Sequence, residues 1–428
     1  MLTLPFEERP LSAMANPMSQ DSHSLQSSTS AGQPPPSSDS SAAAPAFIQW
    51  VLSVCVACTV GAIYYNQPML GAISKQFPDH PVAIGMIPTA TQLGYALGLL
   101  LLVPLGDMLP RRRLILIQTV AAALTLIFAG LVQSAAGLAA VSVLVGVGAS
   151  VTQQIVPLAA ALAAPSRRGA AVGMVMSGLF CGTLLSRTLS GWITDMFGWH
   201  AAFEGGAVLD LLAALALAIT LPSLPPVTRT RYGALLLSLG TLWKQEPVLR
   251  RSAFIQIGQF AAFSIFWSIL ALRLEQPPFE LGAGAAGLFG VLGIAGILIA
   301  PVAGRLADRR GPELMIGVGL ILVLASWSVF YAVPGIAGLA AGVVLLDLGV
   351  QATQISNQHR IYALRAEARS RINTIYMCLM FLGGAAGSML GNLAWHSGGW
   401  TLLCLLGATI TALAMGVHVT AARSQRRS

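Results

Sequence analysis

Apolar runs, each long enough to cross a lipid bilayer, recur along almost the whole of this chain. A transmembrane helix needs about 20 consecutive, mostly apolar residues, and runs of that length lie on both sides of a more polar stretch at 222–251. The runs span residues 47–70, 82–103, 114–134, 137–159, 170–192, 200–221, 252–272, 284–303, 314–334, 336–357, 373–394 and 400–420. This pattern predicts an all-α polytopic membrane protein with twelve transmembrane helices.

The composition argues against an ordinary soluble enzyme. Charged residues make up 9% of the chain and hydrophobic residues 55%, whereas a soluble domain carries roughly 25% charged residues. Zinc-ligand spacing, a phosphate-binding glycine loop and a nucleophile paired with a base are all missing from the sequence. We therefore expect no catalysis, no metal and no cofactor.

The distribution of Lys and Arg predicts the orientation in the membrane. With the N-terminus in the cytoplasm, 21 of the 24 basic residues fall in cytoplasmic segments, as the positive-inside rule requires. We expect a protein of the inner membrane with both termini cytoplasmic. A nucleic-acid partner is the weaker reading of the net charge of +8, because the cations are spread over short segments.

The chain divides into five predicted regions. Residues 1–46 are rich in Ser, Pro, Ala and Gln, and such a segment cannot bury enough apolar surface to fold, so it predicts a disordered tail. The other regions are a six-helix bundle at 47–221, a cytoplasmic linker at 222–251, a second six-helix bundle at 252–420 and a basic tail at 421–428.

The two bundles have the pattern of a duplicated unit. A single offset of 201 residues aligns landmarks of the first bundle with landmarks of the second. The aligned pairs are Asp107 with Asp308, Thr152-Gln153 with Thr353-Gln354, Arg168 with Arg369, Gly182 with Gly383, and Gly198-Trp199 with Gly399-Trp400. Two pseudo-symmetric halves suit alternating access, in which one bundle rocks against the other around a central site.

Several motifs resemble those of a known family. The string GRLADRRG at 304–311 resembles the loop motif A of the major facilitator superfamily, and VPLGDMLPRRR at 103–113 is a degenerate copy. The strings YYNQP at 64–68, TQQIVP at 152–157 and DLGVQATQISNQHRIYAL at 347–364 resemble the bacterial arabinose-efflux-permease-like branch. The resemblance implies the major facilitator fold and a central cavity lined by helices 1, 4, 7 and 10.

The two motif A loops are candidates for a conformational latch. A carboxylate beside Arg at a cytoplasmic helix end can form charge-assisted bonds with neighbouring helix ends. The alternative, that the arginines serve only topology, leaves the two aspartates unexplained. The candidates are Asp107, Arg111, Arg112, Asp308 and Arg309.

Ionisable residues inside the membrane are costly, and they usually face the interior of the bundle. Arg187 and Glu204 lie at similar predicted depths on neighbouring helices, so we expect a structural ion pair between them. Asp347 lies near the middle of helix 10 and begins a polar face that continues through Gln351 and Gln354. We expect Asp347 to bind a proton or the solute; a structural hydrogen-bonded role is the alternative.

Amides and aromatic residues on the same helices are candidates to line the cavity. Each could instead form a hydrogen bond between helices or pack at the lipid interface. The candidates are Gln351, Gln354, Gln153, Gln154, Tyr65, Asn66, Gln67, Gln259 and Trp267. Small residues repeat along Gly182, Ser186 and Ser190, and along Gly383, Gly387 and Gly391, which predicts packing surfaces between the halves.

These expectations combine into a secondary transporter that exports a small organic solute, such as a drug, sugar or metabolite, in exchange for protons bound at Asp347. The expected partners are the solute, protons and the lipid bilayer, and we expect a monomer. A proton-coupled importer is the nearest alternative. A transport-silent sensor would need a soluble signalling domain or a large loop, and neither is visible in the sequence.

Overall fold

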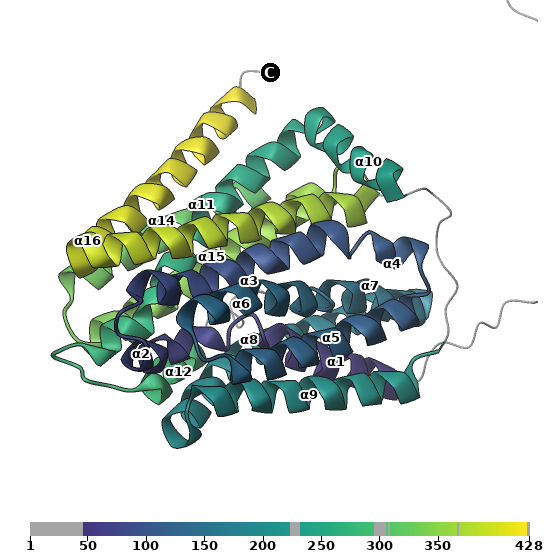
Figure 1. Ribbon diagram of the computed structural model, residues 1–428. Coiled ribbons are helices and arrows are strands. Elements are labelled where there is room, and N and C mark those ends of the chain that lie inside the picture. Colours follow the sequence, from purple (N-terminus) through teal and green to yellow (C-terminus); the bar gives the residue numbers. More distant parts are fainter. Residues whose placement is uncertain (1–45, 223–231, 295–304, 307–308, 366–367, 426–428) are drawn as a thin grey trace, which may run out of the picture. The chain divides into compact units, whose positions relative to one another are not determined.

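The computed structural model describes residues 46–222, 232–294, 305–306, 309–365 and 368–425, and helices make up nearly all of them (Figure 1). The helices of the first half are α1 (Ala46–Gly61), α2 (Asn66–Gln76), α3 (Pro81–Leu101), α4 (Leu105–Met108), α5 (Arg111–Leu131), α6 (Ala135–Ala149), α7 (Thr152–Leu162), α8 (Arg168–Phe197) and α9 (Trp199–Thr220). The later helices are α10 (Tyr232–Gln245), α11 (Pro247–Glu275), α12 (Ala283–Leu292), α14 (Pro312–Ala332), α15 (Ile336–Tyr362) and α16 (Arg369–Gln425).

Within the described residues, ten helices are long and apolar enough to cross a membrane. One of them, α16, contains two helices joined at Gly399, which has the non-helical dihedral angles φ 60° and ψ −151°. A further apolar helix, α12, ends shortly before residues 295–304, which are not described. Within the described residues, each predicted apolar run therefore lies mainly in helix, and the all-α polytopic fold is confirmed.

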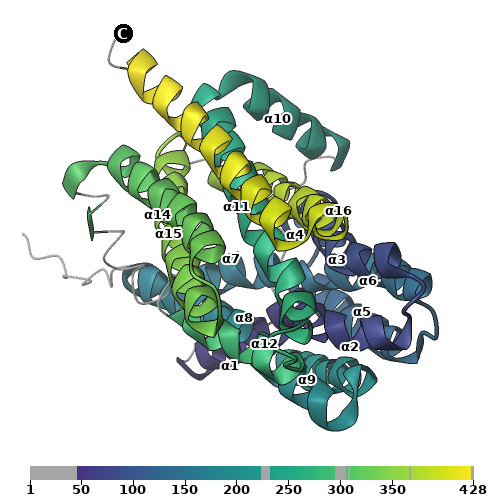
Figure 2. The same ribbon diagram turned by 90° about the vertical axis from the view of Figure 1, so that its left-hand side faces the viewer.

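Equivalent helices pack together in the two halves. In the first half Gly182 of α8 lies against the backbone of Ala57 in α1, and in the second half Gly383 of α16 lies against Ile257 of α11. Since these contacts are related by nearly the same sequence offset, they support the pseudo-symmetry. The predicted location between the halves is wrong for these glycines, because each one packs two helices of the same half. Figure 2 shows the second-half helices α11, α14, α15 and α16 beside those of the first half.

The transmembrane helices end at two chemically different ends of the bundle. The end where α5, α8, α11, α14 and α16 begin carries most of the arginines, and we call it the arginine-rich end. The opposite end carries Lys75, Asp195 and Glu275. In Figure 1, α4 and α10 lie at the arginine-rich end, and α2 and α12 lie at the opposite end.

The predicted linker at 222–251 contains α10 and the first turn of α11. A hydrogen bond and an ion pair help to tie its described part to the bundle. The Tyr232 hydroxyl donates a hydrogen bond to the carbonyl oxygen of Leu101 over 2.8 Å, and Glu246 forms an ion pair with Arg365 over 2.7 Å. Residues 1–45 of the predicted tail, residues 223–231 and residues 426–428 lie outside the described residues.

Candidate transport cavity

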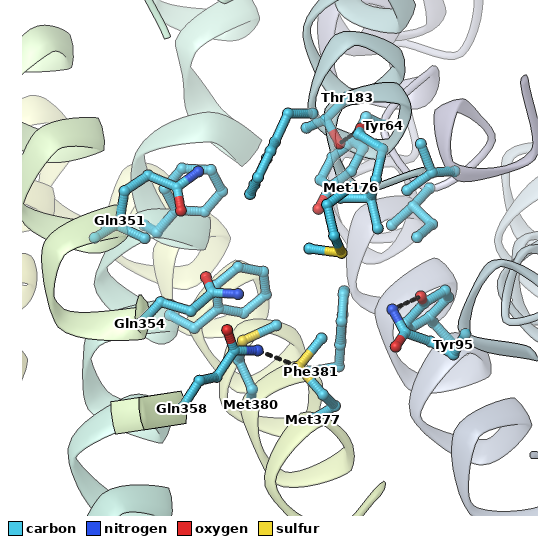
Figure 3. A pocket seen from close by; sticks show the side chains of 18 of the residues that line it. Tyr64, Tyr95, Met176, Thr183, Gln351, Gln354, Gln358, Met377, Met380 and Phe381 are labelled. Carbon is cyan, nitrogen blue, oxygen red and sulfur yellow. Dashed lines mark hydrogen bonds between the residues drawn. The ribbon is translucent and has the colours of Figure 1, made fainter. Parts of the chain in front are cut away.

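A cavity of about 340 Å³ lies between the two halves. Its walls come from α1, α3, α7 and α8 of the first half and from α11, α15 and α16 of the second, together with Gly293 after α12. Figure 3 shows Gln351, Gln354 and Gln358 on one wall and Tyr64, Met176 and Tyr95 across from them. A few polar and charged groups therefore face a mostly apolar and aromatic space, which is the usual composition of a small-molecule site.

The cavity continues toward the arginine-rich end. A second space of about 460 Å³ shares Gln153, Tyr362 and Asn373 with the first and reaches Arg111 and Arg369. Arg369 is exposed at the start of α16. The two spaces together form a path from the middle of the bundle to the arginine-rich end.

At the opposite end the two halves are in direct contact. The Asp195 carboxylate of α8 accepts hydrogen bonds from the backbone N–H groups of Ala283 and Gly284, over 2.9 and 2.7 Å, at the start of α12. The Thr188 hydroxyl donates to the carbonyl oxygen of Gly287 over 3.0 Å. Because a carboxylate also interacts favourably with a helix N-terminus, these bonds hold α8 and α12 together and close this end.

Asp195→Ala is expected to weaken closure of the opposite end. Loss of a carboxylate near a helix N-terminus costs about 0.3–1 kcal/mol at an exposed position, so the equilibrium should shift up to about fivefold toward a conformation open at that end. The measurement is the rate at which a membrane-impermeant maleimide labels Ser190→Cys in a background without the native cysteines. Asp79→Ala is the control, because Asp79 is exposed near the same end. Equal labelling rates for both variants would contradict the role assigned to Asp195.

The predicted polar face of α15 lies on the cavity wall. Asp347, Gln351, Gln354 and Gln358 all line the space, because residues three and four apart on a helix share a face. Asp347 is 8% exposed. The side-chain amide of Gln358 points toward the Met377 sulfur at 4.0 Å.

Arg187 also lines the cavity, and its predicted ion pair with Glu204 is not formed. Arg187 is 2% exposed, and its Nε donates a hydrogen bond to Gln67 Oε1 over 2.8 Å. The rings of Tyr64 and Trp267 have their centres 4.4 and 4.2 Å from the guanidinium carbon. Glu204 is exposed on α9. Arg187 and Glu204 have similar predicted depths in the membrane, but their side chains do not point toward each other. Aromatic rings stabilise the Arg187 cation in place of a carboxylate.

The remaining amide candidates of the first half have separate surroundings. Gln153 lines the cavity and donates to the Tyr95 hydroxyl over 3.2 Å. Gln154 lines only the space toward the arginine-rich end, and its amide donates to Gln118. Asn66 donates to Thr91 Oγ1 over 2.8 Å.

Contrary to the prediction, five of the candidates are not on the cavity wall: Tyr65, Asn66, Gln67, Gln259 and Trp267. Tyr65 packs against Gly206 of α9, and Gln259 donates to the carbonyl oxygen of Gly349 over 2.9 Å. Gln67 and Trp267 act indirectly, since both contact the guanidinium of Arg187. Asn66 and Gln259 instead form hydrogen bonds between helices, which is the alternative prediction for the amides.

The latch candidates are described only in part. Arg111 donates from Nε to the carbonyl oxygen of Gly106 over 3.1 Å, and Arg112 donates to that of Ala218 over 2.7 Å. Arg309 is exposed. The Asp107 side chain and Asp308 lie outside the described residues, so the latch stays a prediction.

Much of the cavity wall was not predicted. The family resemblance directed attention to helices 1, 4, 7 and 10, whereas α3, α8 and α16 supply a large share of the lining. These additional residues include Tyr95, Met176, Thr183, Arg187, Met377, Met380 and Phe381. Arg187 carried a detectable signal as a lone cation inside an apolar run, but the Met and Phe residues match ordinary lipid-facing or core positions.

Comparison with known proteins identifies the family. The family model of the Major Facilitator Superfamily matches residues 52–362. The Escherichia coli transporter YgaY is 42% identical over 361 residues, covering 84% of this chain and 92% of its own. The Streptomyces coelicolor transporter SCO4007 is 34% identical over 396 residues, covering 92% of this chain and 91% of its own.

A solved structure has the same fold. The bacterial homologue of the human lysosomal transporter Spinster, in an inward-facing and occupied conformation, superimposes with a TM-score of 0.71 at 14% identity and covers 88% of this chain and 97% of its own. The matching family and the relatives are transporters, so the chain is a transporter and not an enzyme. The protein is a multi-pass membrane transporter that belongs to the Major Facilitator Superfamily.

Proposed function

We propose that this transporter exports a small organic solute across the inner (cytoplasmic) membrane in exchange for protons, with Asp347 as the proton-binding residue. The strings at 64–68, 152–157 and 347–364 support an efflux carrier through their resemblance to the arabinose-efflux-permease-like branch. Gln351, Gln354 and Gln153, which line the cavity, would form hydrogen bonds with the solute.

The position of Asp347 carries the proposal. It is the acidic residue on the walls of the two connected spaces, within the described part of the chain. A bare carboxylate is costly inside a membrane, so it favours a bound proton or a bound cationic group. A proton and a solute that both need this carboxylate exclude each other, and mutual exclusion at one site produces exchange.

The orientation belongs to the same proposal. We place the arginine-rich end and both termini in the cytoplasm, because 21 of the 24 basic residues then obey the positive-inside rule. The cavity in this structure then faces the cytoplasm. Asp107 with Arg111 and Arg112, and Asp308 with Arg309, would latch cytoplasmic helix ends during the opposite, outward-open state.

Co-transport is the second candidate, and Arg187 favours it. An anionic solute held by Arg187 and a proton held by Asp347 would keep the cavity electrically neutral while both move in the same direction. This arrangement uses the same two residues of the same cavity.

Transport in proteoliposomes distinguishes the two candidates. A pH gradient is imposed on vesicles that contain purified protein, and fluxes are followed for sugars, amino acids, nucleosides and cationic drugs. Solute movement opposite to proton movement, reported by a trapped pH-sensitive dye, is the expected result. Movement in the same direction would establish co-transport, and the absence of flux for the whole panel would contradict both candidates.

A further inference from the structure

Two opposite charges line the cavity from different halves of the protein. Arg187 comes from α8 and Asp347 from α15. No salt bridge joins them within the described residues, although each charge lies close enough to act electrostatically on the other. Since separated charges are costly in a medium of low dielectric constant, this pair favours a ligand that satisfies both.

The Arg187 side presents unused hydrogen-bond donors. Of its three guanidinium nitrogens, only Nε has a hydrogen-bond partner in the described part of the chain. Nη2 is buried without an acceptor. A planar guanidinium binds carboxylates through two parallel hydrogen bonds. Because Nη2 is buried in this conformation, a neighbouring side chain has to move for a carboxylate to reach it.

The Asp347 side of the cavity presents an unused acceptor on the neighbouring Gln351. The buried Oε1 atom of Gln351 has no hydrogen-bond donor among the described residues, and Gln351 lies one helical turn after Asp347 on the same wall. An ammonium group has three N–H donors and no acceptor. It therefore matches the Asp347 carboxylate and the Gln351 amide oxygen, which lie one helical turn apart on the same wall.

We propose that the transported solute is a small amphipathic zwitterion of the amino-acid type. Its carboxylate binds Arg187, its ammonium group binds Asp347 and Gln351, and its apolar body lies among Met176, Met377 and other apolar side chains of the wall. A zwitterion leaves the cavity neutral, whereas a simple cation or anion leaves one protein charge unbalanced. The inference rests on the proposed function, because it takes this cavity as the solute site. It also explains exchange, since a proton on Asp347 displaces the ammonium group.

Three probes with one shared body test this assignment on the purified full-length protein in detergent. L-Phenylalanine carries both charges, phenethylamine lacks the carboxylate and 3-phenylpropionate lacks the ammonium group. Thermal-shift titration measures their affinities through ligand stabilisation. Phenylalanine should bind about 10- to 100-fold more tightly than either analogue, because each loses hydrogen bonds to a charged group. Equal or tighter binding of one analogue, or no binding of phenylalanine, would overturn the assignment.

Variants locate the two ends of the ligand. Arg187→Gln should bind phenylalanine and phenethylamine equally, and Asp347→Asn should bind phenylalanine and 3-phenylpropionate equally. Arg168→Gln, exposed on the same helix as Arg187, should keep the wild-type order of affinities. Persistence of that order in Arg187→Gln would also overturn the assignment. If a cavity variant does not fold, the three wild-type affinities still decide.

The binding assay contains no proton gradient, so it separates this inference from the proposed exchange. Phenylalanine binding without opposing proton flux in proteoliposomes would contradict exchange while supporting the solute class. Proton exchange with a solute that lacks one of the two charges would support exchange and overturn the solute class.

Discussion

Asp347→Asn is expected to abolish transport driven by a pH gradient, reducing gradient-driven solute accumulation to that of protein-free liposomes. Asn keeps the size of the side chain and, like a protonated carboxyl group, has both a donor and an acceptor, but it cannot take up and release a proton. Because Asp347 supplies the carboxylate on the described cavity wall, no neighbouring acid there can replace it. The measurement is solute flux under an imposed pH gradient, together with gradient-free exchange of labelled for unlabelled solute. Gradient-free exchange should persist at saturating solute, because alternating access itself does not need the proton.

Asp210→Asn is the matched control for this experiment. Asp210 is another aspartate inside an apolar helix; it is 0% exposed, and both of its carboxylate oxygens lack a hydrogen-bond partner within the described residues. It belongs to α9 and does not line the cavity, so its replacement should leave pH-driven flux unchanged. Full pH-driven flux in Asp347→Asn would remove Asp347 from the coupling mechanism. Equal losses in both variants would indicate a general structural effect of removing a buried acid.

The fold was predictable because hydrophobic length and charge distribution act over whole segments. A run such as 336–357 is long enough to cross a membrane whatever its neighbours are, and the helix α15 that contains it extends five residues further. The break between helices at Gly399 was also predictable from the sequence, because the offset of 201 residues pairs Gly399 with Gly198. Both glycines have positive φ. Positive φ is easily adopted by glycine and rarely by other residues.

The site was predictable only where one helix determined it. Asp347 and Gln351 share a face through helical spacing alone, so their common wall could be read from the sequence. The direction of Arg187 depends on how α8 is rotated against α1 and α11, and the sequence of one helix does not contain that rotation. Tyr64 and Tyr65 show the same limit, since adjacent residues point in different directions and only Tyr64 lines the cavity.

Gly182→Ala and Gly387→Ala are expected to destabilise the protein, although Ala normally stabilises a helix relative to Gly. A Cβ atom at Gly182 would overlap the backbone of Ala57, and one at Gly387 would overlap the backbone of Ala261. Overpacking of this kind costs about 1–3 kcal/mol, which should lower the melting temperature of the purified protein by several degrees.

Gly173→Ala and Gly416→Ala are the matched controls, because they lie on the same helices, α8 and α16, and an added Cβ would meet no atom within 4 Å. Each should gain up to about 1 kcal/mol from the higher helix propensity of Ala. In both halves, the substitution should therefore lower the melting temperature at the packed glycine and raise it at the open glycine. A change of the same sign at packed and open glycines would contradict the packing described here. Gly182 and Gly387 each join two helices of their own half, so the predicted losses would arise inside each half. That is the property that rigid-body rocking of one half against the other requires.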